Sequence, residues 1–130
     1  MLILVIDDDP AMTELLKVLL STTKAVVYTA DNGKIGIELA QKIKPELIIV
    51  DLLMPEADGW EVCKQVRTFS TVPILILSAL DNPGMVAAAL DAGADDYLIK
   101  PVSSGMLFAH INNLVRRNRS TQGLSQAAIN

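Results

Sequence analysis

A carboxylate, a hydroxyl and an ammonium group each follow a short apolar run in this sequence, and together they could bind a divalent cation and a phosphate group. Asp51 directly follows Leu47–Val50, an unbroken apolar run typical of a strand buried on both faces of a parallel sheet. Open α/β folds bind ligands at the carboxyl ends of such strands. We therefore interpret Asp51 as a phosphoryl acceptor.

Other polar residues also stand where apolar runs end: Asp7 with Asp8, Ser78, and Lys100. Carboxylates packed together repel one another unless they bind protons or share a cation. Oxygen ligands without His or Cys nearby favour Mg²⁺. Lys100 would add positive charge and Ser78 a hydroxyl donor, and phosphoryl transfer requires little beyond positioning and charge neutralisation. Taken singly, each residue could instead be an ordinary turn or surface residue, so the prediction depends on their shared placement.

The bulk properties indicate one acidic domain. The chain has 130 residues and a net charge of -4, and its pI is near 4.8, which argues against direct binding to nucleic acid or anionic membranes. Its single cysteine, Cys63, excludes an intrachain disulfide. No apolar run approaches the roughly 18 residues of a membrane span. We expect a cytoplasmic protein without membrane contact.

Five apolar runs of strand length alternate with five amphipathic segments, the pattern of a doubly wound parallel sheet. Right-handed crossovers favour the flavodoxin-like (CheY-like) α/β fold with strand order 2-1-3-4-5. We expect one domain over residues 1–119, with the last helix ending near Arg117. Residues 120–130 are small and polar, which predicts a flexible tail or a truncated linker to an output domain. The predicted strands are 2–6, 25–30, 45–51, 73–77 and 97–99.

Four motifs give the chain a resemblance to the receiver domain of two-component response regulators, over residues 1 to about 118. They are LVIDDDP from Leu4, IIVDLLMPEADGWEV from Ile48, PILILSA from Pro73 and AGADDYLIKP from Ala92. The resemblance implies that Asp51 accepts a phosphoryl group from a sensor histidine kinase and forms an aspartyl phosphate.

The same resemblance implies a Mg²⁺ site. Asp8 corresponds to a direct ligand together with Asp51, and Asp7 to a ligand acting through water. The backbone carbonyl of Leu53 would be a further ligand.

It also implies a switch. Lys100 would pair first with Asp51 and then with the phosphate, and the Lys100–Pro101 bond is expected to be cis. Ser78 would turn toward the phosphate while Tyr97 rotates inward, which shifts the population between two packings of the fourth helix, fifth strand and fifth helix.

The carboxyl-terminal motif most resembles the winged-helix OmpR/PhoB branch. This branch implies a separate DNA-binding output domain and a phosphorylation-dependent homodimer through the fourth helix, fifth strand and fifth helix. Charged residues of that branch remain at Asp95, Asp96 and Arg116. At four other positions the charge is missing, so we expect an apolar patch of Met85, Val86 and Met106 and a dimer less sensitive to salt. These four positions are Val86, Gly105, Met106 and His110, the last expected to be exposed.

Leu53 and Leu80 flank the expected phosphate position and are both apolar, which predicts a long-lived phosphoryl group. Two alternatives are open. The chain could be a stand-alone receiver acting on a protein target or in a phosphorelay. More remotely, it could be a metal-dependent phosphohydrolase with an Asp nucleophile. Those enzymes carry DxDx(T/V) motifs, whereas Leu52 and Leu53 follow Asp51.

Overall fold

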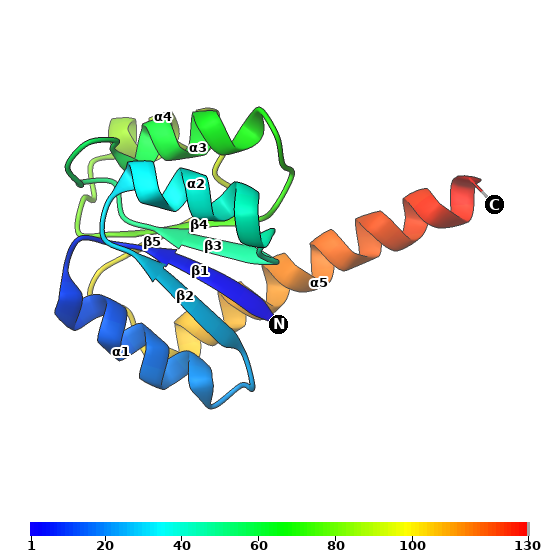
Figure 1. Cartoon of the computed structure of the whole chain (residues 1–130), viewed down its shortest axis with the longest axis horizontal. Coiled ribbons are helices and arrows are strands. Elements are labelled where there is room, and N and C mark those ends of the chain that lie inside the picture. The colour runs from blue at the N-terminus through cyan, green and yellow to red at the C-terminus, as the bar shows by residue number, and fades with distance from the viewer. Residues whose placement is uncertain (130) are drawn as a thin grey trace.

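The computed structural model describes residues 1–129, with side chains for residues 1–120. Five parallel strands form one sheet in the order β2-β1-β3-β4-β5, and helices cover both of its faces (Figure 1). The predicted fold class and strand order are confirmed. The elements are β1 Leu2–Ile6, α1 Pro10–Ser21, β2 Val26–Ala30, α2 Gly33–Ile43, β3 Leu47–Val50, α3 Gly59–Arg67, β4 Ile74–Ser78, α4 Pro83–Asp91, β5 Asp96–Ile99 and α5 Ser104–Ile129.

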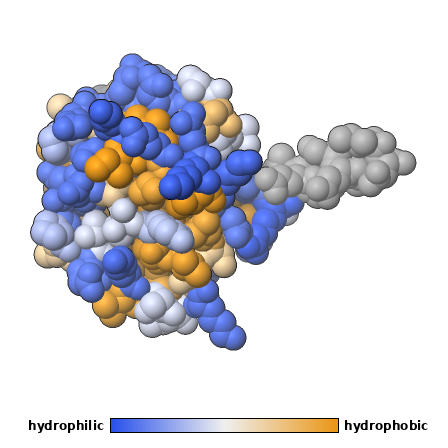
Figure 2. All heavy atoms as spheres, viewed as in Figure 1, coloured by the Kyte–Doolittle hydropathy of each residue, from blue (hydrophilic) through white to orange (hydrophobic). Residues whose placement is uncertain are grey.

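The position of each strand in the sheet explains its sequence. β3 and β4 are buried along their whole length, as expected for central strands covered on both faces. β2 lies at an edge, and its exposure alternates, with Val26 and Tyr28 facing solvent. Figure 2 shows apolar surface on the face where β2 lies between α1 and α2. The exposed apolar side chains of these three elements include Leu15, Val18, Val26 and Ile35.

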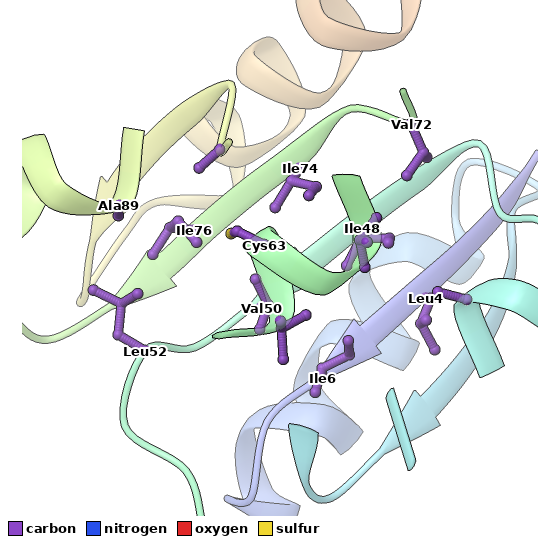
Figure 3. Close-up of a cluster of buried hydrophobic side chains, with 14 of the residues drawn as sticks. Leu4, Ile6, Ile48, Val50, Leu52, Cys63, Val72, Ile74, Ile76 and Ala89 are labelled. Carbon is purple, nitrogen blue, oxygen red and sulfur yellow. The ribbon is translucent and has the colours of Figure 1, made fainter. Parts of the chain in front are cut away.

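The core consists of two apolar clusters, one on each face of the sheet. Leu16 of α1 and Ile111 of α5 pack on one face. On the other face α2, α3 and α4 contribute side chains such as Cys63 and Ala89, which lie against Ile76 and the neighbouring strands (Figure 3). The helices after β1 and β3 therefore cover opposite faces, which opens a crevice at the carboxyl ends of these two strands.

Side-chain caps fix the points at which the helices leave this edge of the sheet. Asp9 Oδ1 accepts a hydrogen bond from the Ala11 amide at 3.0 Å, and Pro10 begins α1, where its fixed φ and missing N–H are tolerated. Asp58 caps α3 in the same way by accepting from the Glu61 amide. These caps anchor the helical ends of the loops that carry Asp8 and Asp51.

The last helix is longer than predicted. α5 runs from Ser104 to Ile129 and does not end near Arg117. Residues 120–129, expected to be a tail or linker, have a helical backbone that continues away from the sheet (Figure 1), whereas Asn130 lies outside the described residues. Within residues 1–129, no helix has both the length and the hydropathy needed to cross a membrane.

Candidate functional site

The carboxyl ends of β1, β3 and β5 bring four charged residues together, which we call the strand-end cluster: Asp7, Asp8, Asp51 and Lys100. The Lys100 Nζ lies 3.0 Å from Asp7 Oδ2 and 3.2 Å from Asp51 Oδ2. Asp8 completes the set, because one carboxylate oxygen from each of the three acids lies within 4.8 Å of the others. Residues 93 positions apart along the chain thus contact one another directly.

Burial and charge act against each other within this cluster. Burial raises the pKa of Asp7, whose side chain is only 4% exposed, although the Asp9 amide and Lys100 partly oppose this effect. Burial disfavours the charged form of Lys100 too, yet its hydrogen bond to Asp7 and the negative charges of Asp51 and Asp7 outweigh that effect and raise its pKa. Lys100 therefore remains an ammonium group at neutral pH.

Both oxygens of the Asp51 carboxylate have hydrogen-bond partners, and the side chain is still partly exposed. Its Oδ1 accepts a hydrogen bond from the Leu52 amide at 2.6 Å, while Oδ2 contacts Lys100. The Asp51 amide donates to the Ile6 carbonyl at 3.0 Å, which fixes the end of β3 against β1. The side chain is 14% exposed, so a reactant can still reach it.

The donor set fits a Mg²⁺ ion. All three acids offer hard carboxylate oxygens, and Asp8 is exposed, so that water could complete the coordination shell. A pocket of about 170 Å³ opens beside Asp7 and Asp8. Leu53, whose carbonyl is the further candidate ligand, lies in the loop after β3 and is 57% exposed.

Ser78 and Tyr97 both contact the loop between β4 and α4. Ser78 is 1% exposed, and its Oγ accepts a hydrogen bond from the Leu80 amide at 3.3 Å. The Tyr97 hydroxyl donates to the Leu80 carbonyl at 2.6 Å. Burial raises the pKa of Tyr97, and the charges of Asp51 and Asp81 add to this effect. The two residues are thus connected through Leu80.

The backbone around Lys100 connects this loop to the cluster. The Lys100 amide donates to the Ser78 carbonyl at 2.8 Å. The Lys100–Pro101 peptide bond is cis, which is the geometry that the resemblance implies.

The α4–β5–α5 face differs from the sequence-based expectation in its charged residues. His110 is only 29% exposed and lies 2.5 Å from Asp96, so the expectation of an exposed histidine is wrong. The reason is that β5 and α5 bring these two side chains together. Asp95 pairs with Arg67 at 2.8 Å, and Arg116 bonds Asn113. The charges retained from the OmpR/PhoB pattern are thus engaged within the chain.

Apolar residues make up much of the exposed surface of this face. Met85 and Met106 are 43% and 51% exposed, and Val86 is half-buried. Leu90 and Ile99 are also exposed, at 43% and 45%, so the expectation from helical spacing that Leu90 faces inward with Ala89 is wrong. Ala89 and Leu90 are consecutive residues of α4 and point in different directions, and only Ala89 is buried.

The family model described as "Response regulator receiver domain" matches residues 3–112 of the chain. Response regulator MprA of Mycolicibacterium vanbaalenii is 41% identical over 127 residues, which are 97% of this chain and 55% of that protein. Transcriptional regulatory protein AfsQ1 of Streptomyces coelicolor is 37% identical over 115 residues, which are 88% of this chain and 51% of that protein. The chain thus spans about half the length of these curated relatives.

Solved structures of response regulators also match this chain. A two-component response regulator from Clostridium difficile superposes with a TM-score of 0.86 at 32% identity, covering 89% of this chain and 96% of that one. The BeF3-activated N-terminal receiver domain of Klebsiella pneumoniae RstA gives a TM-score of 0.86 at 28% identity, covering 89% of this chain and 99% of that one.

Proposed function

This chain belongs to the response regulator receiver domain family, and from this membership and the strand-end cluster we propose that it is a switch phosphorylated on Asp51. The observation that carries the proposal is the position of Lys100, whose ammonium group contacts both Asp7 and Asp51. The Lys100 ammonium group, together with a Mg²⁺ ion held by the three acids, would neutralise the charge of a phosphoryl group added to Asp51.

Asp51 would act as the nucleophile. One of its carboxylate oxygens attacks the phosphorus of a phosphohistidine, the P–N bond breaks, and its electron pair stays on the imidazole nitrogen. Lys100 remains charged and neutralises part of the charge that gathers on the phosphoryl oxygens. Asp8, Asp51, Asp7 through water and the Leu53 carbonyl would hold Mg²⁺, which supplies further charge neutralisation when bound.

The response to phosphorylation would pass through Leu80. Ser78 gives up its hydrogen bond from the Leu80 amide in order to donate to a phosphate oxygen. The Tyr97 hydroxyl donates a hydrogen bond to the Leu80 carbonyl. Movement of Leu80 and the loop between β4 and α4 would therefore change the hydrogen bond that holds Tyr97 in place. The added charge thereby changes the population of two packings of the α4–β5–α5 face.

Incubation with acetyl phosphate and Mg²⁺, followed by intact-mass measurement, tests this function. The wild-type protein should gain one phosphoryl group, and removal of Mg²⁺ by a chelator should prevent the gain. Asp51→Asn should gain nothing under either condition. A wild-type protein that gains no mass, or an Asp51→Asn protein that gains as much as wild type, would refute the proposal.

The partners follow from the same proposal. A sensor histidine kinase would supply the phosphoryl group, the protein would act in the cytoplasm, and the activated receivers would pair through the α4–β5–α5 face. The relatives are about twice as long as this chain, and AfsQ1 is named a transcriptional regulatory protein, which favours a DNA-binding output domain over a stand-alone receiver. DNA binding by the full-length product that depends on Asp51 phosphorylation would support this choice. Its absence would favour the stand-alone receiver.

A further inference from the structure

The amino terminus of α2 touches the loop that follows Asp51. A Cβ built on Gly33 would lie 1.9 Å from the Ala57 carbonyl oxygen and 2.7 Å from the Ala57 Cβ. The nearest obstacle is a backbone atom, which cannot rotate away as a side chain can. Only glycine therefore allows α2 to begin at this distance from the loop.

The loop is strained at the point of contact. Glu56 has a φ of +70°, which non-glycine residues rarely adopt. The Ala57 amide donates to the Pro55 carbonyl at 2.9 Å, closing a three-residue turn centred on Glu56. A turn of this kind with positive φ is rare and strained, and such strain persists only where the surroundings hold it. Gly33 contacts the residue directly after Glu56.

The other end of the loop is fixed against α3. The Gly59 amide donates to the Leu52 carbonyl at 2.9 Å, and a Cβ on Gly59 would lie 2.5 Å from the Asp51 carbonyl oxygen. Leu53 lies between this anchor and the turn held by Gly33. A displacement of Ala57 would therefore move the segment that carries the Leu53 carbonyl.

We propose that Gly33 is a positioning residue for the phosphorylation site, although it contacts none of the charged side chains there. By having no side chain, it lets α2 hold the strained turn at Glu56, and the turn places the Leu53 carbonyl beside Asp51. This inference rests on the proposed function, since the carbonyl matters only if the strand-end cluster binds Mg²⁺.

The test compares Gly33→Ala with Gly36→Ala, one turn further along α2. A Cβ on Gly36 would lie 2.5 to 2.9 Å from side-chain atoms of Ile6 in the core, away from the loop. Both substitutions should lower the thermal unfolding midpoint. Only Gly33→Ala should weaken Mg²⁺ binding, by about tenfold or more, as expected when the support of a metal ligand is disturbed. Mg²⁺ titration followed by the amide NMR signals of Leu52 and Leu53 measures this, and the acetyl phosphate reaction rate should fall in parallel.

Ala57→Gly provides a variant without a clash, in case Gly33→Ala does not fold. It loosens the same contact from the loop side and should weaken Mg²⁺ binding by about two- to threefold. The inference would be overturned, and the proposed function left intact, by either of two results. One is a Mg²⁺ affinity equal to that of wild type in Gly33→Ala or, if that variant does not fold, in Ala57→Gly. The other is a loss of Mg²⁺ affinity in Gly36→Ala equal to that in Gly33→Ala. A wild-type protein with no Mg²⁺-dependent shifts would instead refute the proposed function itself.

Discussion

Lys100 determines the electrostatics of the site because it is the cation that contacts two of the three acids in the strand-end cluster. Its side chain is 16% exposed, and that of Asp7 is 4% exposed. A buried carboxylate without a cationic partner is strongly disfavoured, so Asp7 depends on Lys100 to remain ionised at neutral pH. The same lysine is therefore important both for the proposed chemistry and for stability.

Lys100→Ala should lower the free energy of unfolding at pH 7 by about 1–3 kcal/mol without Mg²⁺. The loss should shrink as the pH falls. Burial holds the folded-state pKa of Asp7 above its ordinary value, so the folded protein binds this proton more tightly than the unfolded chain does. The stability that comes from this proton is fully present below the ordinary pKa and is lost as the pH rises through the folded-state pKa. Urea unfolding at pH 7 and near pH 4 measures the difference. The control is Lys64→Ala at an exposed position of α3, and an equal deficit at both pH values would contradict the account.

Leu53 and Leu80 bear on how long the phosphoryl group survives. We predict a wild-type lifetime of minutes or longer, because apolar side chains at these positions disfavour an attacking water. Leu53→Asn should shorten it, whereas Leu15→Asn, at an exposed position of α1, should not. Loss of phosphoprotein after removal of acetyl phosphate gives the lifetime, and a wild-type value of seconds would show that the apolar side chains do not protect the bond.

At the scale of elements, Arg67 joins α3 to two neighbouring segments. Its guanidinium donates to the carbonyls of Gly93 and Val72 at 3.0 and 2.7 Å and pairs with Asp95 at 2.8 Å. Asp95 also accepts from the Ile74 amide at 2.8 Å, so the same network fixes the start of β4. Arg67 therefore holds the turn before β5 in place.

Arg67→Ala should cost about 2–3 kcal/mol of unfolding free energy, because several hydrogen bonds to a charged donor are lost together. Arg119→Ala is the matched control. Arg119 pairs with Glu46 at 2.7 Å, but it is 61% exposed, and surface pairs of this kind contribute about 0–1 kcal/mol. Chemical denaturation measures the loss of unfolding free energy in each variant. Equal losses in the two variants would show that burial of the Arg67 network does not matter.

The sequence predicts the strands and helices better than it predicts the side-chain contacts between them. The ends of the strands can be predicted because buried apolar runs stop at Asp7, Asp51 and Lys100. The start of α1 can be predicted because Pro10 follows a residue type that caps helices. Contacts such as Asp96 with His110 join side chains of different elements and leave no local pattern in the sequence. The strained turn at Glu56 escaped prediction for the same reason, since Gly33 holds it from another helix.

At the scale of the whole molecule, the α4–β5–α5 face is where the activated receivers are proposed to pair. Asp95 and Asp96 already have partners within the chain, whereas the exposed side chains of Met85, Leu90, Ile99 and Met106 are apolar. Burial of these side chains would stabilise a dimer without new ion pairs. Such a dimer differs from one held by intermolecular salt bridges in its response to salt.

With beryllofluoride and Mg²⁺ as the phosphate mimic, sedimentation should show a dimer that persists from low to high salt. Met106→Asp should prevent it, and Val18→Asp, an equally drastic change at an exposed position of α1, should not. Dissociation of the wild-type dimer at high salt would indicate an ion-paired interface instead.

The proposed switch depends most directly on Asp51 being the residue that carries the phosphoryl group. Reduction of the phosphorylated protein with borohydride converts an aspartyl phosphate to homoserine, and tandem mass spectrometry of the peptides locates the change. We predict conversion at position 51 alone, dependent on both acetyl phosphate and Mg²⁺. Conversion at Asp7 or Asp8, or none at position 51 in a protein that has gained a phosphoryl group, would contradict the account.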